Sequence, residues 1–172
     1  MLIRRETAAD IDAIRDVHRS AFASSEGTEP VEAGLVDALR ADVGWVPELS
    51  LVALDPRDQT VCGHVVCTRG TVAGRPALGL GPLGVVKDGQ SRGTGSALMH
   101  AVLGAADALG EQLVVLLGHT GYYPRFGFVP AAGLGITAPD PSWGDHFQAR
   151  PLSAYDSGLR GEFGYAKPFT EL

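Results

Sequence analysis

The sequence predicts an α/β fold in which a helix connects two parallel strands. Three consecutive patterns carry this prediction: a strand at residues 77–86, a helix at residues 93–109 and a strand at residues 113–117. The last strand is apolar at every position, which is typical of a strand buried on both faces. A strand, a helix and a strand in this order form a unit whose strands are parallel. The helix is indicated by apolar residues at helical spacing, namely Leu98, Val102, Ala105, Ala106 and Leu109.

Further strands and two helices are predicted before this unit. A strand at residues 2–5 is followed by Thr7 to Asp10, which resembles the capping box of a helix start. The helix that follows has an apolar face formed by Ile11, Ile14, Val17, His18, Ala21 and Phe22. Pro30 suits the first turn of a second helix. The predicted buried face of that helix is Val31, Leu35, Ala38 and Leu39. Two more strands are predicted at residues 50–54 and 61–68.

The C-terminal half is less regular. Gly81-Pro82 interrupts the long strand, and because proline cannot donate to a sheet, we expect a bulge or an edge there. Residues 131–152 are rich in glycine and proline and show little periodicity, so they are predicted to form a surface loop or a substrate-side lid. A last strand is predicted at residues 161–169. Without internal repeats or linkers, residues 1–172 are predicted to form a single domain.

The composition argues against several classes of protein. An apolar content of 45% and a mean hydropathy of +0.08 are typical of a soluble globular protein. A net charge of −6 and a pI near 5.3 argue against nucleic-acid binding, which depends on basic patches. An acidic surface could steer a cationic amine, although solubility alone would account for it. With no apolar signal region and no stretch of membrane-spanning length, we expect a cytoplasmic protein without a membrane partner.

Cys62 and Cys67 are the only cysteines of the chain. One pair in a chain of this size is not a disulfide framework, and two ligands do not make a zinc site. We therefore expect reduced thiols and no metal.

A polar, glycine-rich loop at residues 90–96 joins the long strand to the crossover helix. The first N–H groups of a helix lack partners within it and carry partial positive charge, so phosphate binds at such a place. Gly93 and Gly95 let the backbone approach an anion closely. Arg92 adds a charged, planar fork suited to phosphate. The loop is therefore predicted to bind an anion.

Two other nucleotide-binding motifs fit the chain less well. A P-loop requires G-x-x-x-x-G-K-[ST], but the sixth residue from Gly89 is Thr94 and no lysine follows. The dinucleotide motif G-x-G-x-x-G matches residues 79–84, but a strand continues after it where a helix should begin. An oxidoreductase built on residues 79–84 stays an alternative that titration with a nicotinamide cofactor would test.

The string that remains, Q-x-x-G-x-G at residues 90–95, resembles the pyrophosphate loop of the GNAT superfamily of acetyl-CoA-dependent N-acyltransferases. Residues 122–128, Tyr-Tyr-Pro-Arg-Phe-Gly-Phe, resemble the family's Y-x-x-x-G-F segment. Together with Gly118-His119, this segment is most similar to a small bacterial branch of predicted N-acetyltransferases. The resemblance covers most of the chain and implies a mixed, mostly antiparallel twisted sheet. In that sheet a central splayed pair of parallel strands is flanked by helices.

The resemblance also implies acetyl-CoA as the cosubstrate and no metal. The gap between the splayed strands would receive the pantetheine arm, and the backbone N–H of Val85 would stabilise the oxyanion that forms at the thioester carbonyl. The N–H groups of the loop would hold the pyrophosphate. The implied cofactor-binding residues are Leu83, Gly84, Val85, Gln90, Ser91, Arg92, Gly93, Thr94, Gly95 and Ser96.

Acyl transfer to an amine requires proton transfers. A primary amine with a pKa of about 10.4 is nucleophilic in only roughly one molecule in a thousand at pH 7, so a base or a water chain is useful. The departing thiolate benefits from a proton donor. Tyr123, four residues before Gly127, matches the family's general acid in position. The alternative is that Tyr123 only packs beside the cofactor, and Tyr122 is interpreted as structural or substrate-facing.

The sequence does not identify the base. Glu29 and Glu32 flank the start of the second helix, which is a wall of the acceptor pocket in the resembling family. His64 lies in a strand that could line the acceptor site. These three are the substrate candidates, and each has a structural or solvated alternative. His18, on an apolar helix face, is more typical of a core histidine, and His119 ends the buried strand.

The sequence therefore predicts an enzyme that moves an acetyl group from acetyl-CoA to a primary amine by direct transfer in a ternary complex. The acceptor is a small molecule or a peptide that the sequence does not identify. Neither cysteine is placed to carry the acyl group. The alternative is a non-catalytic acyl-CoA-binding sensor or regulatory domain. The residues do not indicate the oligomeric state, but a homodimer is common in the resembling family, so the resemblance allows one.

Overall fold

The computed structural model describes residues 1–172 and contains nine strands and four α-helices. The strands are β1 (Leu2–Arg5), β2 (Trp45–Leu54), β3 (Val61–Val72), β4 (Arg75–Val85), β5 (Leu113–Leu117), β6 (Val129–Pro130), β7 (Ile136–Thr137), β8 (Phe147–Pro151) and β9 (Gly161–Gly164). The helices are α1 (Ile11–Ala21), α2 (Val31–Ala41), α3 (Thr94–Ala108) and α4 (Lys167–Thr170).

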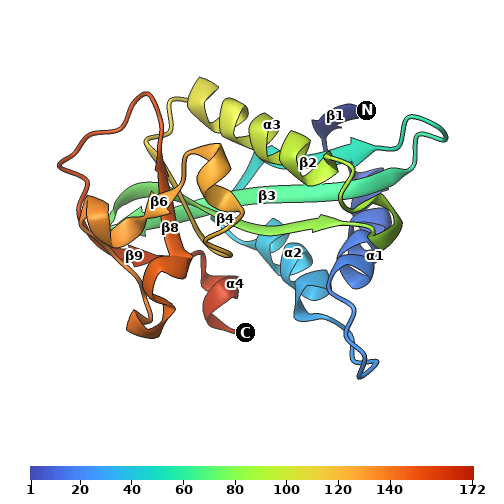
Figure 1. Ribbon diagram of the computed structural model, residues 1–172, viewed down its shortest axis with the longest axis horizontal. Coiled ribbons are helices and arrows are strands. Elements are labelled where there is room, and N and C mark those ends of the chain that lie inside the picture. Colours follow the sequence, from blue (N-terminus) through green and yellow to red (C-terminus); the bar gives the residue numbers. More distant parts are fainter.

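The strands form one mixed sheet with helices on both faces (Figure 1). Its order is β1-β2-β3-β4-β5-β8-β6, with β9 added to β3 and β7 paired with β9. Most neighbours are antiparallel, and β4 and β5 form the central parallel pair. Helix α3 makes the crossover between these two strands. The predicted fold class, a mostly antiparallel sheet with a central parallel pair between helices, is confirmed.

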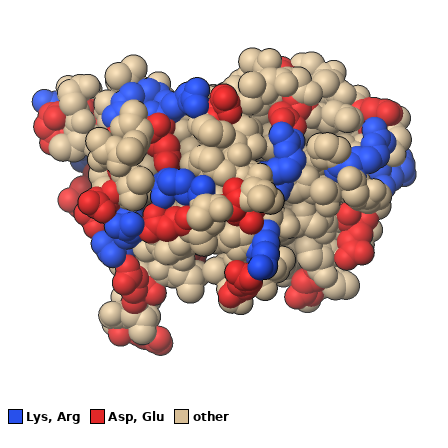
Figure 2. All heavy atoms as spheres, turned by 180° about the vertical axis from the view of Figure 1, so that it is seen from behind, with Lys and Arg blue, Asp and Glu red and all other residues tan.

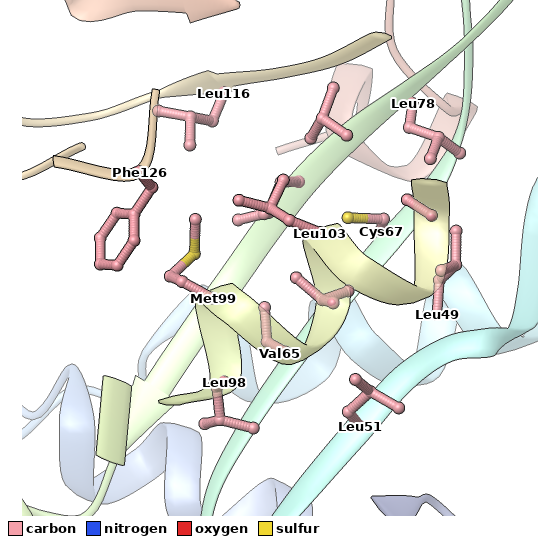
Figure 3. Close-up of a cluster of buried hydrophobic side chains, with 14 of the residues drawn as sticks. Leu49, Leu51, Val65, Cys67, Leu78, Leu98, Met99, Leu103, Leu116 and Phe126 are labelled. Atoms are coloured by element: carbon pink, nitrogen blue, oxygen red, sulfur yellow. The ribbon is translucent and has the colours of Figure 1, made fainter. Parts of the chain in front are cut away.

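The main core lies between α3 and the sheet. Leu98, Met99 and Leu103 of α3 face the strands, where Val65 and Cys67 of β3 are fully buried (Figure 3). Full burial of each such aliphatic side chain stabilises the fold by about 1.5–3 kcal/mol. Helices α1 and α2 cover the opposite face of the sheet (Figure 1). The sheet is therefore covered on both faces at its centre, which fixes β4 and β5 in place.

The parallel pair separates soon after it forms. Strands β4 and β5 pair at Leu78 with Val114 and at Gly79 with Val115, and nowhere further along β4. The register between β3 and β4 also shifts here, because Leu80 and Leu83 of β4 lie opposite residues only two positions apart in β3. The extra residue of β4 is a bulge at the Gly81–Pro82 peptide, which is cis. The predicted interruption is confirmed, and the strands diverge beyond it.

The prediction of an irregular surface loop over residues 131–152 is wrong, and the alternative of a substrate-side lid stays a prediction. Strand β8 lies within this range, pairs antiparallel with β5 over its whole length, and buries Phe147, Gln148 and Ala149. The strand is too short for an alternating pattern to stand out between glycine and proline residues. Strand β8 pairs with the edge of β5 opposite β4, so β5 is an interior strand of the sheet.

Two further predictions need correction: the buried face of α2 and the extent of the last strand. Val31 and Ala38 are exposed, and the buried residues of α2 are Ala33, Leu35, Val36 and Leu39. The stripe is rotated because Val36 packs toward α1 while Leu35 and Leu39 pack toward β3 and α4. The last strand is shorter than residues 161–169, since β9 ends at Gly164 and α4 follows.

Candidate active site

Two cavities adjoin where β4 and β5 separate. The first, of about 510 Å³, lies at the N-terminal end of α3 and is named the loop cavity after its lining residues Gln90, Ser91, Gly93, Gly95 and Ser96. The second, of about 380 Å³, is named the aromatic cavity after its lining residues Tyr123, Trp143, Tyr165 and Phe169. Leu83 of β4 and Phe22 line both cavities. Ligands in the two cavities would therefore meet at these side chains.

The floor of the loop cavity is the start of α3. Gly93 is the N-cap residue with φ +86°, and a Cβ built on it would meet no atom within 4 Å, so the space in front of it is open. The first hydrogen bond of α3 runs from the N–H of Ala97 to the carbonyl of Gly93 at 2.9 Å. The N–H groups of Thr94, Gly95 and Ser96 therefore lack partners within the helix. With no acidic residue in the first turn, this end of the helix suits an anion.

The edge of β4 is the second backbone element of the loop cavity. The Val86 N–H donates to the Cys62 carbonyl of β3 at 3.0 Å, whereas the Val85 carbonyl accepts from the Gln90 side-chain amide at 3.0 Å. Because the N–H and C=O of one strand residue point to the same edge, the Val85 N–H faces the gap beside β5. Gln90 thereby ties the loop to the strand edge.

The positive side chain of the loop cavity is Arg125, which was not predicted from the sequence. Its guanidinium carbon lies 4.6 Å from the centroid of the Tyr122 ring, and its Nε donates to the Tyr122 carbonyl at 2.9 Å. Arg92 lines a separate cavity beside Asp55 and Arg57. The available signal for Arg125 was its place inside the Tyr-Tyr-Pro-Arg-Phe-Gly-Phe segment.

The structure brings most of the predicted cofactor-binding residues together. Those that line the loop cavity are Leu83, Val85, Gln90, Ser91, Gly93, Gly95 and Ser96. The other three lie around it. Thr94 is buried and shares the neighbouring cavity with Arg92. Gly84 faces α1, where a Cβ built on it would lie 2.7 Å from Nδ1 of His18. Gly84 is therefore a position where only glycine fits without movement of α1.

Tyr123 lies in the wall of the aromatic cavity. Its ring packs so closely against Gly118 that any side chain at position 118 would collide with it. Burial, and secondarily the neighbouring Tyr122, raise the pKa of the Tyr123 hydroxyl. The phenol therefore carries its proton at neutral pH. Tyr122 lines the loop cavity instead, and its hydroxyl oxygen lies 3.2 Å from the position that a Cβ on Gly95 would take.

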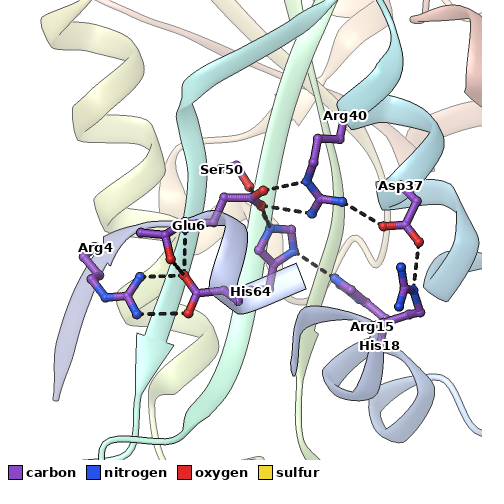
Figure 4. A network of polar contacts seen from close by, with 10 residues as sticks. Arg4, Glu6, Arg15, His18, Asp37, Arg40, Ser50 and His64 are labelled. Atoms are coloured by element: carbon purple, nitrogen blue, oxygen red, sulfur yellow. Dashed lines mark hydrogen bonds and ion pairs between the residues drawn. The ribbon is translucent and has the colours of Figure 1, made fainter. Parts of the chain in front are cut away.

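His64 lines neither cavity, because it belongs to a buried polar network behind β4 (Figure 4). Nδ1 of His64 lies 2.9 Å from Nε2 of His18, and Nε2 of His64 lies 2.8 Å from the hydroxyl of Ser50. The Ser50 hydroxyl donates to Glu6 at 2.5 Å, and Arg40 donates to the same carboxylate at 2.7 Å. The network joins β2, β3, α1 and α2 through Glu6, the residue that follows β1.

The carboxylate of Glu6 sets the direction of the hydrogen bonds in this network. Burial opposes ionisation of Glu6, but the nearby Nε2–H of His64 at 3.4 Å and hydrogen bonds from Arg40 and Ser50 lower its pKa to about 2, so it is ionised and only accepts. The Ser50 hydroxyl donates its hydrogen bond to Glu6, so its oxygen accepts a hydrogen bond from Nε2–H of His64. His64 in turn accepts from His18, which leaves Nδ1 of His18 as a buried acceptor against Gly84, with no partner. Burial lowers the pKa of both histidines, so both are neutral.

The two glutamates that flank the start of α2 are placed differently. Glu29 is exposed and paired with Arg19 at 2.7 Å. Glu32 lines the aromatic cavity, where it is the one charged residue among the lining side chains. It forms no ion pair and no side-chain hydrogen bond with the rest of the chain. Of the three predicted substrate residues, only Glu32 therefore faces a cavity.

Comparison with known proteins places the chain in a family. It is 35% identical over 168 residues to the uncharacterised N-acetyltransferase YjhQ of Escherichia coli K12, a match covering 93% of this chain and 89% of that protein. The chain belongs to the GNAT family of N-acetyltransferases. No family model matches it. The family predicted from residues 90–95 and 122–128 is therefore confirmed.

Two solved structures support the same assignment. YhbS of E. coli, a GNAT family N-acetyltransferase in complex with CoA, has a TM-score of 0.86 at 31% identity, over 98% of this chain and 91% of that one. A GNAT family acetyltransferase from Brucella melitensis in complex with acetyl-CoA has a TM-score of 0.79 at 31% identity, over 98% of this chain and 97% of that one. The predicted enzyme class, an acetyltransferase, is confirmed.

The surface charge, the helices, the metal-ligating side chains and the cysteines of this acetyltransferase bear on what it can bind and how it can react. Lys and Arg side chains are interspersed with Asp and Glu on the face shown in Figure 2. None of its helices has the length and apolar character needed to cross a membrane. No group of three or more His, Cys, Asp or Glu side chains is placed to hold a metal ion. Cys62 and Cys67 are free and buried, and neither lines the loop cavity or the aromatic cavity.

Proposed function

We propose that this acetyltransferase transfers an acetyl group from acetyl-CoA directly to a primary amine while both are bound. The observation that carries the proposal is the shared boundary of the two cavities at Leu83 and Phe22. One cavity offers backbone donors for a phosphate-bearing ligand. The other offers an apolar chamber with one carboxylate. A donor and an acceptor bound on either side of Leu83 would have their reacting ends next to each other.

The loop cavity suits acetyl-CoA in its donor set. The free N–H groups of Gly95 and Ser96, together with the guanidinium of Arg125, would hold the pyrophosphate. The exposed edge of β4 at Leu83 and Val85 would pair with the amides of the pantetheine arm, because this edge has no strand partner. When bound, acetyl-CoA supplies an activated acyl thioester. The two solved relatives with CoA and acetyl-CoA support this assignment.

The chain itself supplies orientation and a proton donor. The N–H of Val85 faces the gap and would donate to the thioester carbonyl oxygen as negative charge develops there. Tyr123 would give its proton to the departing CoA sulfur, since its raised pKa keeps the phenol protonated at neutral pH. Both groups act from the walls of the gap between β4 and β5, and neither requires a covalent acyl-enzyme.

Direct transfer is supported by the positions of the cysteines. Burial raises the pKa of the Cys62 and Cys67 thiols, which removes the thiolate that an acyl carrier needs. Cys67 lies in the core between α3 and the sheet (Figure 3). The chain has no other cysteine. The amine, after it has released its ammonium proton to water, is therefore expected to attack the thioester carbonyl itself; the N–C bond forms, the C–S bond breaks, and the nitrogen loses its second proton to water.

The cofactor assignment is tested by calorimetric titration of acetyl-CoA into wild type and Ser96→Glu. A glutamate at this position adds negative charge to the first turn of α3, where it favours the helix but repels pyrophosphate. We expect micromolar binding to wild type and a loss of at least about a hundredfold in the variant. Gly104→Glu, on an open stretch of the same helix, is the matched control. Equal binding to Ser96→Glu and wild type would refute the loop cavity as the cofactor site.

A further inference from the structure

The aromatic cavity restricts the chemistry of the amine acceptor, an inference that rests on the proposed function. We propose that the acceptor is a primary amine with a single positive charge on an apolar, aromatic body, without a carboxylate and without a second ammonium group. An arylalkylamine has this composition.

The lining of the cavity is apolar on nearly every side. Eleven of its fourteen lining residues are hydrophobic. Leu116 and Leu117 of β5 and Leu35 of α2 form aliphatic parts of the wall. A ligand that fills about 380 Å³ of such space gains affinity from apolar surface and loses it for every polar group left without a partner.

Aromatic rings from the C-terminal third of the chain, Trp143, Tyr165 and Phe169, form another part of the wall. Tyr165 lies between Trp143 and Phe169, with ring centroids 6.3 Å and 4.9 Å from its own. Tyr165 also packs edge-on against Phe163, at 4.7 Å, so it is held in place from behind. A fixed wall of flat rings favours a flat partner, because offset and edge-on aromatic pairs are preferred arrangements. The body of the acceptor is therefore inferred to be aromatic.

One carboxylate faces this apolar chamber. Glu32 has no protein partner, whereas Glu29, three residues earlier, is neutralised by Arg19. An unpaired carboxylate at the wall of an apolar cavity stabilises one cation that enters. The ammonium form of a primary amine supplies that cation on entry, and aromatic faces nearby add to the attraction.

The same lining disfavours the other common amines. An amino acid would bring a carboxylate into a cavity with no lysine or arginine in its wall and with Glu32 already negative. A polyamine would bring a second ammonium, and no second Asp or Glu side chain lines the cavity to meet it. In both cases a charge loses water without gaining a partner, which is among the most costly events in a protein interior.

Paired substrates test the class directly. We expect CoA release from saturating acetyl-CoA to be faster with 2-phenylethylamine than with phenylalanine or spermidine, by about a hundredfold in kcat/KM. Phenylalanine carries the same ring and amine and differs by the carboxylate. Comparable or faster turnover of phenylalanine or spermidine would overturn the inferred class and leave the proposed function standing. Failure of all amines, tested in a broad panel, would overturn both together.

The role of Glu32 has a matched control in the chain. Glu32→Gln keeps the shape of the side chain and removes its charge, so we expect KM for 2-phenylethylamine to rise about tenfold or more while acetyl-CoA affinity is unchanged. Glu29→Gln, which changes a glutamate outside the cavity, should leave both constants as in wild type. An unchanged KM in Glu32→Gln would contradict the inference.

Binding can be followed without catalysis. Trp143 lines the aromatic cavity, whereas the other tryptophan, Trp45, stacks on Arg40 outside it. Addition of 2-phenylethylamine to the CoA-loaded protein should change the tryptophan fluorescence, and Trp143→Phe should abolish the change. A signal that persists in Trp143→Phe, or no saturable signal in wild type, would place the amine outside this cavity.

Discussion

The two cavities beside Leu83 are built in different ways. Most of the loop cavity is lined by one continuous stretch, residues 83–96, and the rest by Ala21, Phe22, Tyr122 and Arg125. The aromatic cavity is lined by residues that lie far apart in the sequence, from α2, β4, β5 and α4 and from Phe22, Tyr123, Trp143, Tyr165 and Leu172. A backbone site fixes the class of ligand, because N–H groups at a helix start suit any phosphate. A side-chain site selects one ligand, because each wall residue can change independently.

The difference has a consequence for sensitivity to mutation. In the loop cavity most side-chain changes should be tolerated unless they add charge or a Cβ where the backbone must approach a ligand. In the aromatic cavity single changes in the wall should alter which amine is accepted. Four further predictions test or sharpen this contrast, beginning with the largest expected effect.

The buried network that supports the edge of β4 should make stability depend on pH. Burial, and secondarily His64, lower the pKa of His18 from 6.5 to about 3, while Glu6 stays ionised. The unfolded chain therefore binds this proton at higher pH than the folded chain does. The stability contributed by neutral His18 is complete above about pH 6.5 and is lost as the pH falls toward 3, a loss on the order of a few kcal/mol.

Urea unfolding at a series of pH values measures this effect. His18→Leu removes the titrating group, so its unfolding free energy should fall less steeply than that of wild type between about pH 6.5 and 4. Parallel curves for the two proteins would show that His18 does not carry the dependence.

Removal of the proposed proton donor should affect the rate and not the affinity for the cofactor. Tyr123→Phe keeps the ring against Gly118 and removes the hydroxyl, so we expect kcat to fall about a hundredfold with acetyl-CoA binding nearly unchanged. Tyr122→Phe, on the other cavity, is the control and should retain most of the rate. Steady-state kinetics and calorimetry separate the two constants. A wild-type rate in Tyr123→Phe across the pH range would refute the assignment.

The glycine requirement of the β4 edge is tested at Gly84. A Cβ there would lie 2.7 Å from Nδ1 of His18, so Gly84→Ala should destabilise the protein by about 1–3 kcal/mol. Gly104→Ala, in open space on α3, should be neutral or slightly stabilising. The two unfolding midpoints give the comparison. If Gly84→Ala is as stable as Gly104→Ala, the contact between α1 and β4 is not as close as described.

The smallest effect distinguishes the two arginines near the loop. Arg125→Ala should weaken acetyl-CoA binding by about tenfold, the value of roughly one charge-assisted hydrogen bond. Arg92→Ala should change the affinity by less than about twofold, because Arg92 lines the cavity beside Asp55 and Arg57. Calorimetry on both variants measures this, and a larger loss in Arg92→Ala would restore the assignment made from the sequence.

The contrast also explains how much the sequence could predict. The strand, loop and helix around residues 90–96 were predictable because local spacing, glycine placement and the motif lie in one short stretch. The bulge at Gly81-Pro82 was predictable because proline cannot donate to a sheet. Most of the fold class follows from these local signals, and the structure confirms it.

The lining of the aromatic cavity could not be predicted from local sequence signals. Whether Glu32 or Glu29 faces a cavity depends on the rotation of α2, which is set by packing against α1 and α4 and not by local pattern. His64 was a reasonable candidate from its strand, but its side chain lies on the face of the sheet that α1 covers. Trp143 and Tyr165 reach the cavity only because β8 and β9 join the sheet, and β8 was missed.

The most direct test of simultaneous binding at Leu83 is initial-rate kinetics with both substrates varied. Double-reciprocal plots of rate against acetyl-CoA, at several fixed concentrations of an accepted amine, should give intersecting lines, as a ternary complex requires. Parallel lines, the signature of a covalent acyl-enzyme in ping-pong kinetics, would contradict direct transfer across the shared boundary of the two cavities.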